Sequence, residues 1–468
     1  MRRKAYSMLE GPLLPSIISY TIPIILTSVL QLLFNAADLI VVGQHCGSIS
    51  VAAVGATGSL TSLLVNFFVG LSVGAGATMA NAIGSRDDQT AHRIVHTALP
   101  TALVCGAVLT VIGIGFSETF LSWMGTPLEV LPLSAVYMKI YFGGILFTMV
   151  YNFCAAILRA AGDTKSPLLF LTIAGVVNVL LNLLFVKVFH MNVAGVALAT
   201  MIAQGISAVL VVLALMRRHD ACRLRLNKMR FYGPQLAKII GQGLPAGIQS
   251  SLFSISNTLI QSSINSFGDI LMSGNAAAAN IEGFVYVSQN AYMQTAINFT
   301  GQNTGAGQYQ RVKKILWTCL ACVAVTGIIV GGAACLLAPQ LLPIYITDSA
   351  EAIQWGIVRM TYVCAPYFLC GMMEVTTGVL RGMGASVAPM VVSIMGACAF
   401  RVGWIYTVFQ IPQYHTPQSL YISYPISWIL TFTTQLIVCL WVYRRRCAAH
   451  QNSCSSKNDP SREQEDSI

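Results

Sequence analysis

The segment LRAAGDTKSP at residues 158–167 separates two long apolar runs, and LRGMGASVAP at residues 380–389 does the same later in the chain. The second segment begins 222 residues after the first (380 against 158), and the same offset pairs Pro23 with Pro245. Glycine allows a tight reversal and proline opens a helix without losing a backbone donor, so each segment alone is only a good turn. The shared offset indicates that the chain consists of two similar halves.

The composition is that of a membrane protein. Of the 468 residues, 55% are hydrophobic and only 9% are charged, whereas about a quarter are charged in soluble domains. A helix of about 20 apolar residues spans a bilayer core of about 30 Å and satisfies its own backbone. Such runs fall at residues 15–42, 51–80, 93–116, 131–157, 167–189, 192–216, 238–266, 275–300, 313–337, 354–379, 386–410 and 419–443. We therefore predict about twelve transmembrane helices.

The basic residues indicate the orientation of these helices. If the N-terminus is cytoplasmic, all but four of the 27 Lys and Arg residues fall in cytoplasmic segments, as the positive-inside rule requires. The four exceptions are Lys139, Lys187, Arg359 and Arg401. We predict a multi-pass protein of the bacterial cytoplasmic (inner) membrane with both termini cytoplasmic. The net charge of +10 then reflects topology, which argues against a nucleic-acid partner.

The predicted organisation has four parts. Residues 1–216 form an N-terminal six-helix bundle, 217–236 a basic cytoplasmic linker, 237–443 a C-terminal six-helix bundle, and 444–468 a polar, disordered tail. Because each half has an even number of spans, the halves are related by an axis along the membrane normal and enclose a central cavity.

These features resemble the multidrug and toxic compound extrusion (MATE) family, and within it the bacterial DinF-like branch, over about residues 12–445. The resemblance rests on the following motifs: Pro23, Asn35-x-x-Asp38, Val51-Ala52-Ala53-Val54-Gly55, the glycines of 70–74, the two Leu-Arg turns, and the segment 301–307. It implies an all-α fold of two pseudo-symmetric six-helix bundles that form a V-shaped central cavity. It also implies a monomeric antiporter in the lipid bilayer that exports organic cations or amphiphilic small molecules in exchange for protons or sodium ions.

Asp38 is the first candidate for ion coupling. It lies among Leu33, Phe34, Ile40 and Val41, and an apolar setting favours the protonated carboxyl group, so Asp38 can act as a proton switch. The alternative is a carboxylate that simply reaches interfacial water near the outer end of the helix.

The family resemblance places Asn178, Asn182 and Thr200 beside Asp38. Asn178 and Asn182 are four residues apart and share a helix face. Relatives often carry Asp where this chain has Asn182, and a single carboxylate favours protons over sodium. No metal is expected beyond a sodium ion at Asp38, and no cofactor is expected. Resemblance also makes Pro23 a hinge, with a static kink as the alternative.

The C-terminal half does not repeat this pocket, because apolar residues stand at the matching positions. Instead, a substrate route is predicted along Gln31, Asn35, Asn152, Glu282, Glu374 and Arg401. Carboxylates in a cavity would attract cationic drugs, and methionine and aromatic side chains such as Tyr286 and Met293 could give adaptable apolar contacts. For Glu282 and Glu374 the alternative is a structural ion pair with Arg401 or an interhelical hydrogen bond, and for the methionine and aromatic residues it is ordinary packing.

Other chemistry has little support. The Cys319-x-x-Cys322 pair lies within a span, and His92 and His96 are interpreted as a solvent-exposed pair at the cytoplasmic end of a helix. No nucleophile arrangement or phosphate-binding loop is present, so the protein is not predicted to be an enzyme and its energy must come from an ion gradient. A lipid-linked precursor flippase is the alternative function, although such proteins carry a central basic cluster, of which only Arg401 is recognisable here.

Overall fold

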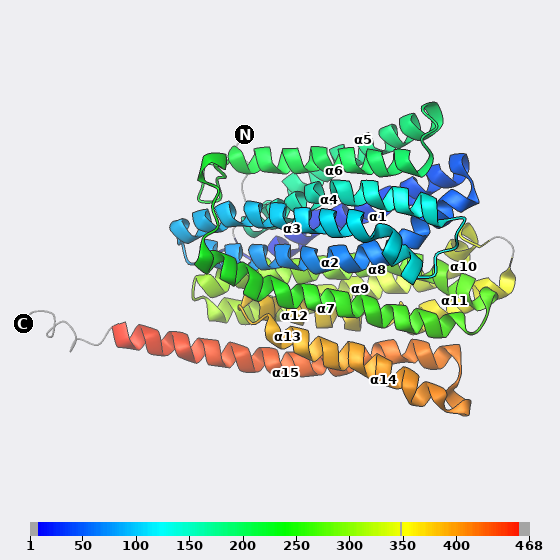
Figure 1. Cartoon of the computed structure of the whole chain (residues 1–468). Helices are drawn as coiled ribbons and strands as arrows, with labels where there is room; N and C mark the ends of the chain where they lie inside the picture. Colours follow the sequence, from blue (N-terminus) through cyan, green and yellow to red (C-terminus); the bar gives the residue numbers. More distant parts are fainter. Residues whose placement is uncertain (1–7, 347–348, 458–468) are drawn as a thin grey trace, which may run out of the picture.

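The computed structural model describes residues 8–346 and 349–457, and these residues form helices and connecting turns without a β-strand. Figure 1 shows two layers of long helices that run side by side, with the first half of the chain in one layer and the second half in the other. The linker after α6 and both ends of the described chain lie at the same end of the molecule (Figure 1).

The N-terminal half contains six long helical segments. They are α1 (Leu13–Cys46), α2 (Ser48–Gly84), α3 (Asp88–Trp123), α4 (Leu131–Ala160), α5 (Lys165–Leu183) with the π-helical η1 (Leu184–Val188), and α6 (Asn192–Met216). A 3-10 turn, η2 (Leu226–Lys228), interrupts the linker to the second half. The predicted turn after α4 is present, with Gly162 at φ 84°.

The C-terminal half repeats this plan with more interruptions. Its elements are α7 (Gly233–Asn265), α8 (Asp269–Gly305), α9 (Tyr309–Leu336), α10 (Ala338–Leu341), η3 (Leu342–Ile344), α11 (Ala350–Val363), α12 (Tyr367–Gly382), α13 (Val387–Ser393), the π-helical η4 (Ile394–Ala399), α14 (Phe400–Tyr406), η5 (Val408–Gln410), η6 (Pro412–Tyr414) and α15 (Pro417–Lys457). Gly384 has φ 82°, close to the value at Gly162, so the two Leu-Arg turns share a left-handed glycine that other residues would adopt only with strain.

The predicted all-α architecture of about twelve spans in two bundles is confirmed. Among the described residues, nine helices are long and apolar enough to cross a bilayer, and the pair α11 and α12, bent by 44°, makes a tenth. The remaining two long helices, α7 and α8, are rich in Ser, Asn and Gln. Their polar side chains line the cavity between the bundles, which explains why they fall short on hydropathy.

A glycine seam joins the two bundles. Gly70 and Gly74 of α2 pack on the backbone of α7, and Gly84 packs on Gln302 of α8, so closely that an added Cβ would overlap the opposite backbone. Towards the other end of α2, a Cβ added at Gly55 or Gly58 would meet nothing within 4 Å. The close contacts that these glycines make with the C-terminal bundle therefore lie towards the linker end of α2, as expected for two lobes in the predicted V-shaped arrangement.

Two sequence predictions about the ends of the bundles need correction. The helix α15 continues through residue 444 to Lys457, because Arg444, Arg445 and Arg446 are good helix formers; the predicted tail beyond residue 457 lies outside the described residues. The pair His92 and His96 is not solvent-exposed as a whole. His96 is fully buried, and its Nε2 accepts a hydrogen bond from the Arg225 backbone N–H at 3.0 Å, which fastens the linker to α3.

Candidate functional site

Asp38 lies on α1, where its carboxylate faces α5 and α6 and is only 8% exposed. Asn182 Nδ2 donates to Asp38 Oδ1 at 2.5 Å, and Thr200 Oγ1 donates to Oδ2 at 3.2 Å. Asn178 Nδ2 donates to Thr200 Oγ1 at 3.2 Å. The four residues predicted to couple the ion are thus brought into one hydrogen-bonded group, which we call the Asp38 pocket.

The Asp38 pocket contains no basic side chain. Both hydrogen-bond donors to the Asp38 carboxylate in the described chain, the Asn182 amide and the Thr200 hydroxyl, are neutral. The Asn182 side chain is fully buried, and its Oδ1 has no hydrogen-bond partner among the described residues. A buried carboxylate beside an unused carbonyl oxygen offers what a proton or a small cation needs, namely negative charge and oxygen ligands.

The end of α5 contributes to this geometry. The helix widens into the π-helical turn η1 two residues after Asn182, and such turns occur frequently at functional sites. A second π-helical segment, η4, leads into α14 and Arg401 in the other half. The two segments do not stand at matching positions of the repeat, so each half has its own local deformation next to its own polar group.

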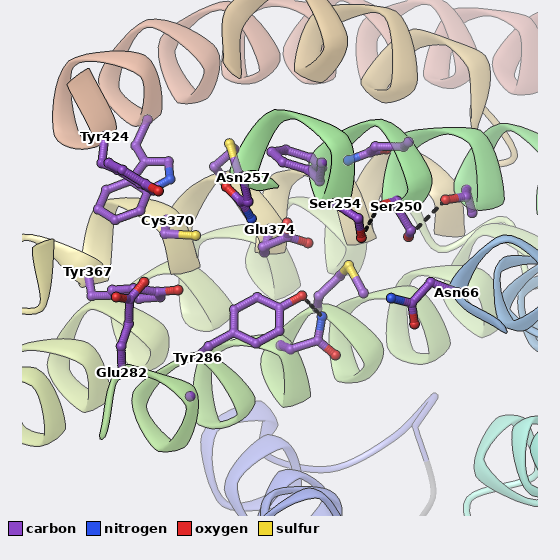
Figure 2. Close-up of a pocket in the computed structure, with 18 of the residues that line it drawn as sticks. Asn66, Ser250, Ser254, Asn257, Glu282, Tyr286, Tyr367, Cys370, Glu374 and Tyr424 are labelled. Carbon is purple, nitrogen blue, oxygen red and sulfur yellow. Dashed lines mark hydrogen bonds between the residues drawn. The ribbon is translucent and has the colours of Figure 1, made fainter. Parts of the chain in front are cut away.

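A second site lies in the cavity between the bundles, about 680 Å³ in volume (Figure 2). We call it the C-terminal cavity because α7, α8, α11, α12, α14 and α15 supply most of its wall, with α2 closing one side. Of the predicted substrate residues, Glu282, Glu374 and Arg401 line it. Gln31 and Asn35 are exposed on α1 instead, and Asn152 bonds the Thr148 carbonyl of its own helix at 2.9 Å.

Glu282 forms an ion pair, but with a partner that the sequence did not indicate. Arg359 Nη2 donates to Glu282 Oε2 at 2.7 Å, and Arg359 Nη1 donates to Asn275 Oδ1 at 2.7 Å. The alternative that paired Glu282 with Arg401 is therefore wrong, because α11 carries Arg359 against the polar face of α8. The sequence signal was present, since Arg359 is one of the four basic residues outside the predicted cytoplasmic segments.

Arg401 has no carboxylate partner among the described residues. Its Nε donates to Ser427 Oγ at 2.9 Å and its Nη1 to Asn257 Oδ1 at 3.4 Å, while Nη2 has no partner in the described chain. The guanidinium lies 4.2 Å from the ring centroid of Tyr424 and 5.7 Å from that of Trp428. Arg401 is thus held by neutral groups and aromatic faces.

Arg381 also belongs to the C-terminal cavity, which sequence analysis missed. It stands in the LRGMGASVAP turn segment at the end of a helix, yet its side chain is buried and donates from Nη2 to Gln249 Oε1 at 2.8 Å. Glu374, two turns earlier on α12, is 8% exposed and stands near the middle of the lining in Figure 2.

The polar residues of α7 were missed as well, although a signal existed. They follow a helical spacing from Gln249 to Gln261, and this stripe faces the C-terminal cavity: Gln249, Ser250, Ser254, Asn257 and Gln261.

The fold and the two polar sites define a multi-pass membrane transporter built from two similar bundles. The MatE family model matches residues 23–184 and 245–407, and its two matches begin at the two prolines of the internal repeat. The chain belongs to the MATE family of multidrug and toxic compound extrusion transporters, as the resemblance predicted.

Individual relatives agree with this assignment. The chain is 28% identical to the "Probable multidrug resistance protein YpnP" of Bacillus subtilis, over 85% of this chain and 89% of that protein. It is 24% identical to a "FAD transporter" of Shewanella oneidensis, over 75% and 78%. A solved outward-facing structure of a multidrug resistance MATE family transporter matches the fold with a TM-score of 0.87 and 21% identity, over 96% of this chain and 99% of that one.

Proposed function

We propose that this protein is a secondary active exporter that moves amphiphilic small molecules out of the cell in exchange for protons. Asp38 is the coupling residue in this proposal, and both termini lie in the cytoplasm. The observation that carries it is the Asp38 pocket, a buried carboxylate within the membrane whose hydrogen-bond partners are all neutral.

The physical argument concerns the cost of a buried charge. A carboxylate in a low-dielectric setting is expensive unless a counter-charge neutralises it, and neutral hydrogen bonds compensate only part of that cost. Proton binding removes the charge. A turn of the Asn182 amide would then let its oxygen accept the new O–H, whereas its nitrogen donates to the charged carboxylate. The same amide can therefore serve both protonation states.

Sodium is the alternative coupling ion. The carboxylate of Asp38, the unused Asn182 Oδ1 and the Thr200 hydroxyl are the kind of oxygen ligands that a hard cation prefers. The pocket supplies only one carboxylate, however, and binding a sodium ion within the membrane against its hydration favours more than one negative ligand. This balance supports protons.

Helix α1 connects the Asp38 pocket to the contact between the bundles. Thr21 Oγ1 and Thr295 Oγ1 of α8 are hydrogen-bonded at 2.8 Å, and Pro23 lies between that contact and Asp38. Since proline removes a helix hydrogen bond, α1 can bend there. We propose that protonation of Asp38 loosens its bonds to α5 and α6, so that α1 bends at Pro23 and moves its contact with α8.

A flippase for lipid-linked precursors remains the second candidate because of one observation. The sequence indicated a single suitably placed basic residue, Arg401, whereas Arg359, Arg381 and Arg401 all line the C-terminal cavity. Basic clusters of this kind suit phosphate groups. Flipping of a fluorescent polyprenyl phosphate in protein-containing vesicles, without release of soluble substrates, would favour this function over export.

The export proposal is tested with Asp38→Asn in vesicles that hold the purified protein. An imposed pH gradient should drive transport of at least one of two fluorescent amphiphiles, the cationic ethidium or an anionic carboxycoumarin, by the unaltered protein. Asp38→Asn should abolish that transport while the protein stays monodisperse in detergent. Asp269→Asn is the matched control, because Asp269 is exposed at the start of α8 and far along the chain from the pocket. Unchanged transport in Asp38→Asn would remove Asp38 from the coupling mechanism.

A further inference from the structure

The C-terminal cavity carries more positive than negative charge. Among the residues that the structure describes, five charged side chains line it: Glu282, Glu374, Arg359, Arg381 and Arg401. Arg359 and Glu282 neutralise each other through their 2.7 Å ion pair. That leaves Arg381 and Arg401 against Glu374 alone, so the cavity retains a net positive charge when Glu374 is ionised and a larger one when it is not.

Arg401 is the group with unused binding capacity. It is 2% exposed, and no described carboxylate lies within ion-pair distance of it. A guanidinium has more N–H donors than the two hydrogen bonds to Ser427 and Asn257 employ, and Nη2 is unpartnered in the described chain. A buried cation inside a membrane protein without a counter-ion is costly, and such residues mark sites on the path of a charged ligand.

The surroundings of Arg401 suit a flat organic group. Tyr424 and Trp428 of α15 pack on the guanidinium, and the Tyr367 ring stands 5.0 Å from that of Trp428. Figure 2 places Tyr424 and Tyr367 at the same end of the cavity. An aromatic ring that enters here would contact other rings while an attached anionic group reaches the guanidinium edge, which binds carboxylates and phosphates in a two-pronged geometry.

We infer that the C-terminal cavity selects aromatic amphiphiles that carry a carboxylate or phosphate group, with Arg401 as the residue that binds this anionic group. The inference rests on the proposed export function and names its substrate class. It opposes the expectation from sequence that cavity carboxylates favour cations, because Glu282 is already neutralised by Arg359 and Glu374 is outnumbered.

Equilibrium binding tests the charge preference without any ion gradient. The purified full-length protein in lipid nanodiscs is titrated with three coumarin probes that carry a carboxylate, a phosphate or a quaternary ammonium group, and binding is followed by fluorescence anisotropy. Both anionic probes should bind at least about tenfold more tightly than the ammonium probe, as expected for one charge-assisted hydrogen-bonded contact. Equal affinities, or tighter binding of the ammonium probe, would overturn the inference.

Variants of Arg401 assign the preference to one side chain. Arg401→Gln should lower the affinity for both anionic probes about tenfold and leave the ammonium probe unaffected or better bound. Arg401→Lys keeps the charge but loses the planar fork, so its affinity should be intermediate. Lys228→Gln removes one positive charge from the exposed linker and should change nothing. Full anion affinity in a folded Arg401→Gln would refute the role of Arg401.

The source of the anionic group is separated by a fourth probe, a fluorescent polyprenyl phosphate presented in the nanodisc lipid. Tighter binding of this lipid than of the soluble phosphate would assign the cavity to a lipid headgroup, and the reverse order to a soluble substrate. Failure of the export proposal would appear differently, as gradient-driven transport that does not respond to Asp38→Asn, because the binding assay uses no gradient.

Discussion

Replacing Asn182 with Asp should make transport by this protein respond to sodium. Asn182 is fully buried, and its amide nitrogen lies 2.5 Å from Asp38 Oδ1. The substitution is almost isosteric, so the helices can keep their places, but a neutral donor becomes a second acceptor that carries charge. The Asp38 pocket would then hold two carboxylates in contact, with no basic residue of the described chain bonded to Asp38.

The magnitude follows from the separation of the two groups. Two unit charges about 3 Å apart at an effective dielectric constant of about 20 repel by about 5 kcal/mol. Such a repulsion prevents both carboxylates from being ionised together unless a cation lies between them. A shared proton or a sodium ion relieves it, and the second negative ligand is what the native pocket lacks for sodium.

The assay compares two driving forces in the same vesicles. Export of the fluorescent dye that the unaltered protein transports, ethidium or the carboxycoumarin, is measured under an imposed pH gradient and, separately, under an imposed sodium gradient. The unaltered protein should respond to the pH gradient, and Asn182→Asp should gain a response to the sodium gradient. Asn227→Asp in the exposed linker makes the same chemical change outside the membrane and should behave as the unaltered protein does.

One result would refute the reasoning. If folded Asn182→Asp transported with the same response to both gradients as the unaltered protein, the side chain at position 182 would not take part in ion coupling. A sodium response already present in the unaltered protein would instead show that one carboxylate suffices, and would replace the proton in the proposed exchange.

Three further predictions concern stability, each measured by thermal unfolding of the purified protein. Gly84→Val should destabilise it by about 1–3 kcal/mol through overpacking of the glycine seam, whereas Gly58→Val, which enters open space, should have little effect; equal losses would contradict the seam. Glu282→Gln should lower the free energy of unfolding by about 3–5 kcal/mol, because it leaves the buried Arg359 without its carboxylate partner. Glu118→Gln breaks an exposed pair with Lys139 and should lower the free energy of unfolding by less than about 1 kcal/mol. Asp87 is the N-cap of α3, and hydrogen bonds from Thr90 lower the pKa of its carboxyl group. The ionised Asp87 therefore stabilises the folded protein fully above the ordinary pKa of about 4, and this stabilisation is lost as the pH falls through the lowered pKa. The deficit of Asp87→Ala at neutral pH should therefore vanish in acid, and a deficit that grows in acid would exclude this cap.

Sequence and structure differ most at two arginines of the C-terminal cavity, Arg381 and Arg359. Arg381 sits in a turn segment whose sequence explains it fully as a helix end, and nothing in that segment shows that its side chain turns inward to Gln249. Arg359 was visible as a basic residue outside the cytoplasmic segments, but its partner Glu282 is on another helix. A sequence pattern reports the face of one helix, whereas an ion pair requires the distance between two.

The Asp38 pocket shows the opposite case. Asn178 and Asn182 share a helix face because they are four residues apart, and a carboxylate such as Asp38 in an apolar run indicates a functional site. Their meeting with Thr200 was expected only from family resemblance. The hydrogen bonds among the four side chains agree with that expectation, while their role in coupling stays a prediction, as do the hinge at Pro23 and the substrate roles of Gln31, Asn35 and Asn152.

The sequence by itself determined that the chain lies in a membrane, how many times it spans it, and that it consists of two similar halves. These properties depend on local hydropathy and on a regular offset between similar segments. The LRAAGDTKSP segment and its repeat were also recognisable as two equivalent turns between helices, because glycine and proline affect the backbone only at and next to their own positions. Only the tertiary structure decided the charge of the C-terminal cavity. That charge is a sum over side chains from different helices. Ion pairing depends on how the helices pack; it neutralises Glu282 and Arg359 and leaves Arg401 without a carboxylate partner in the described part of the chain.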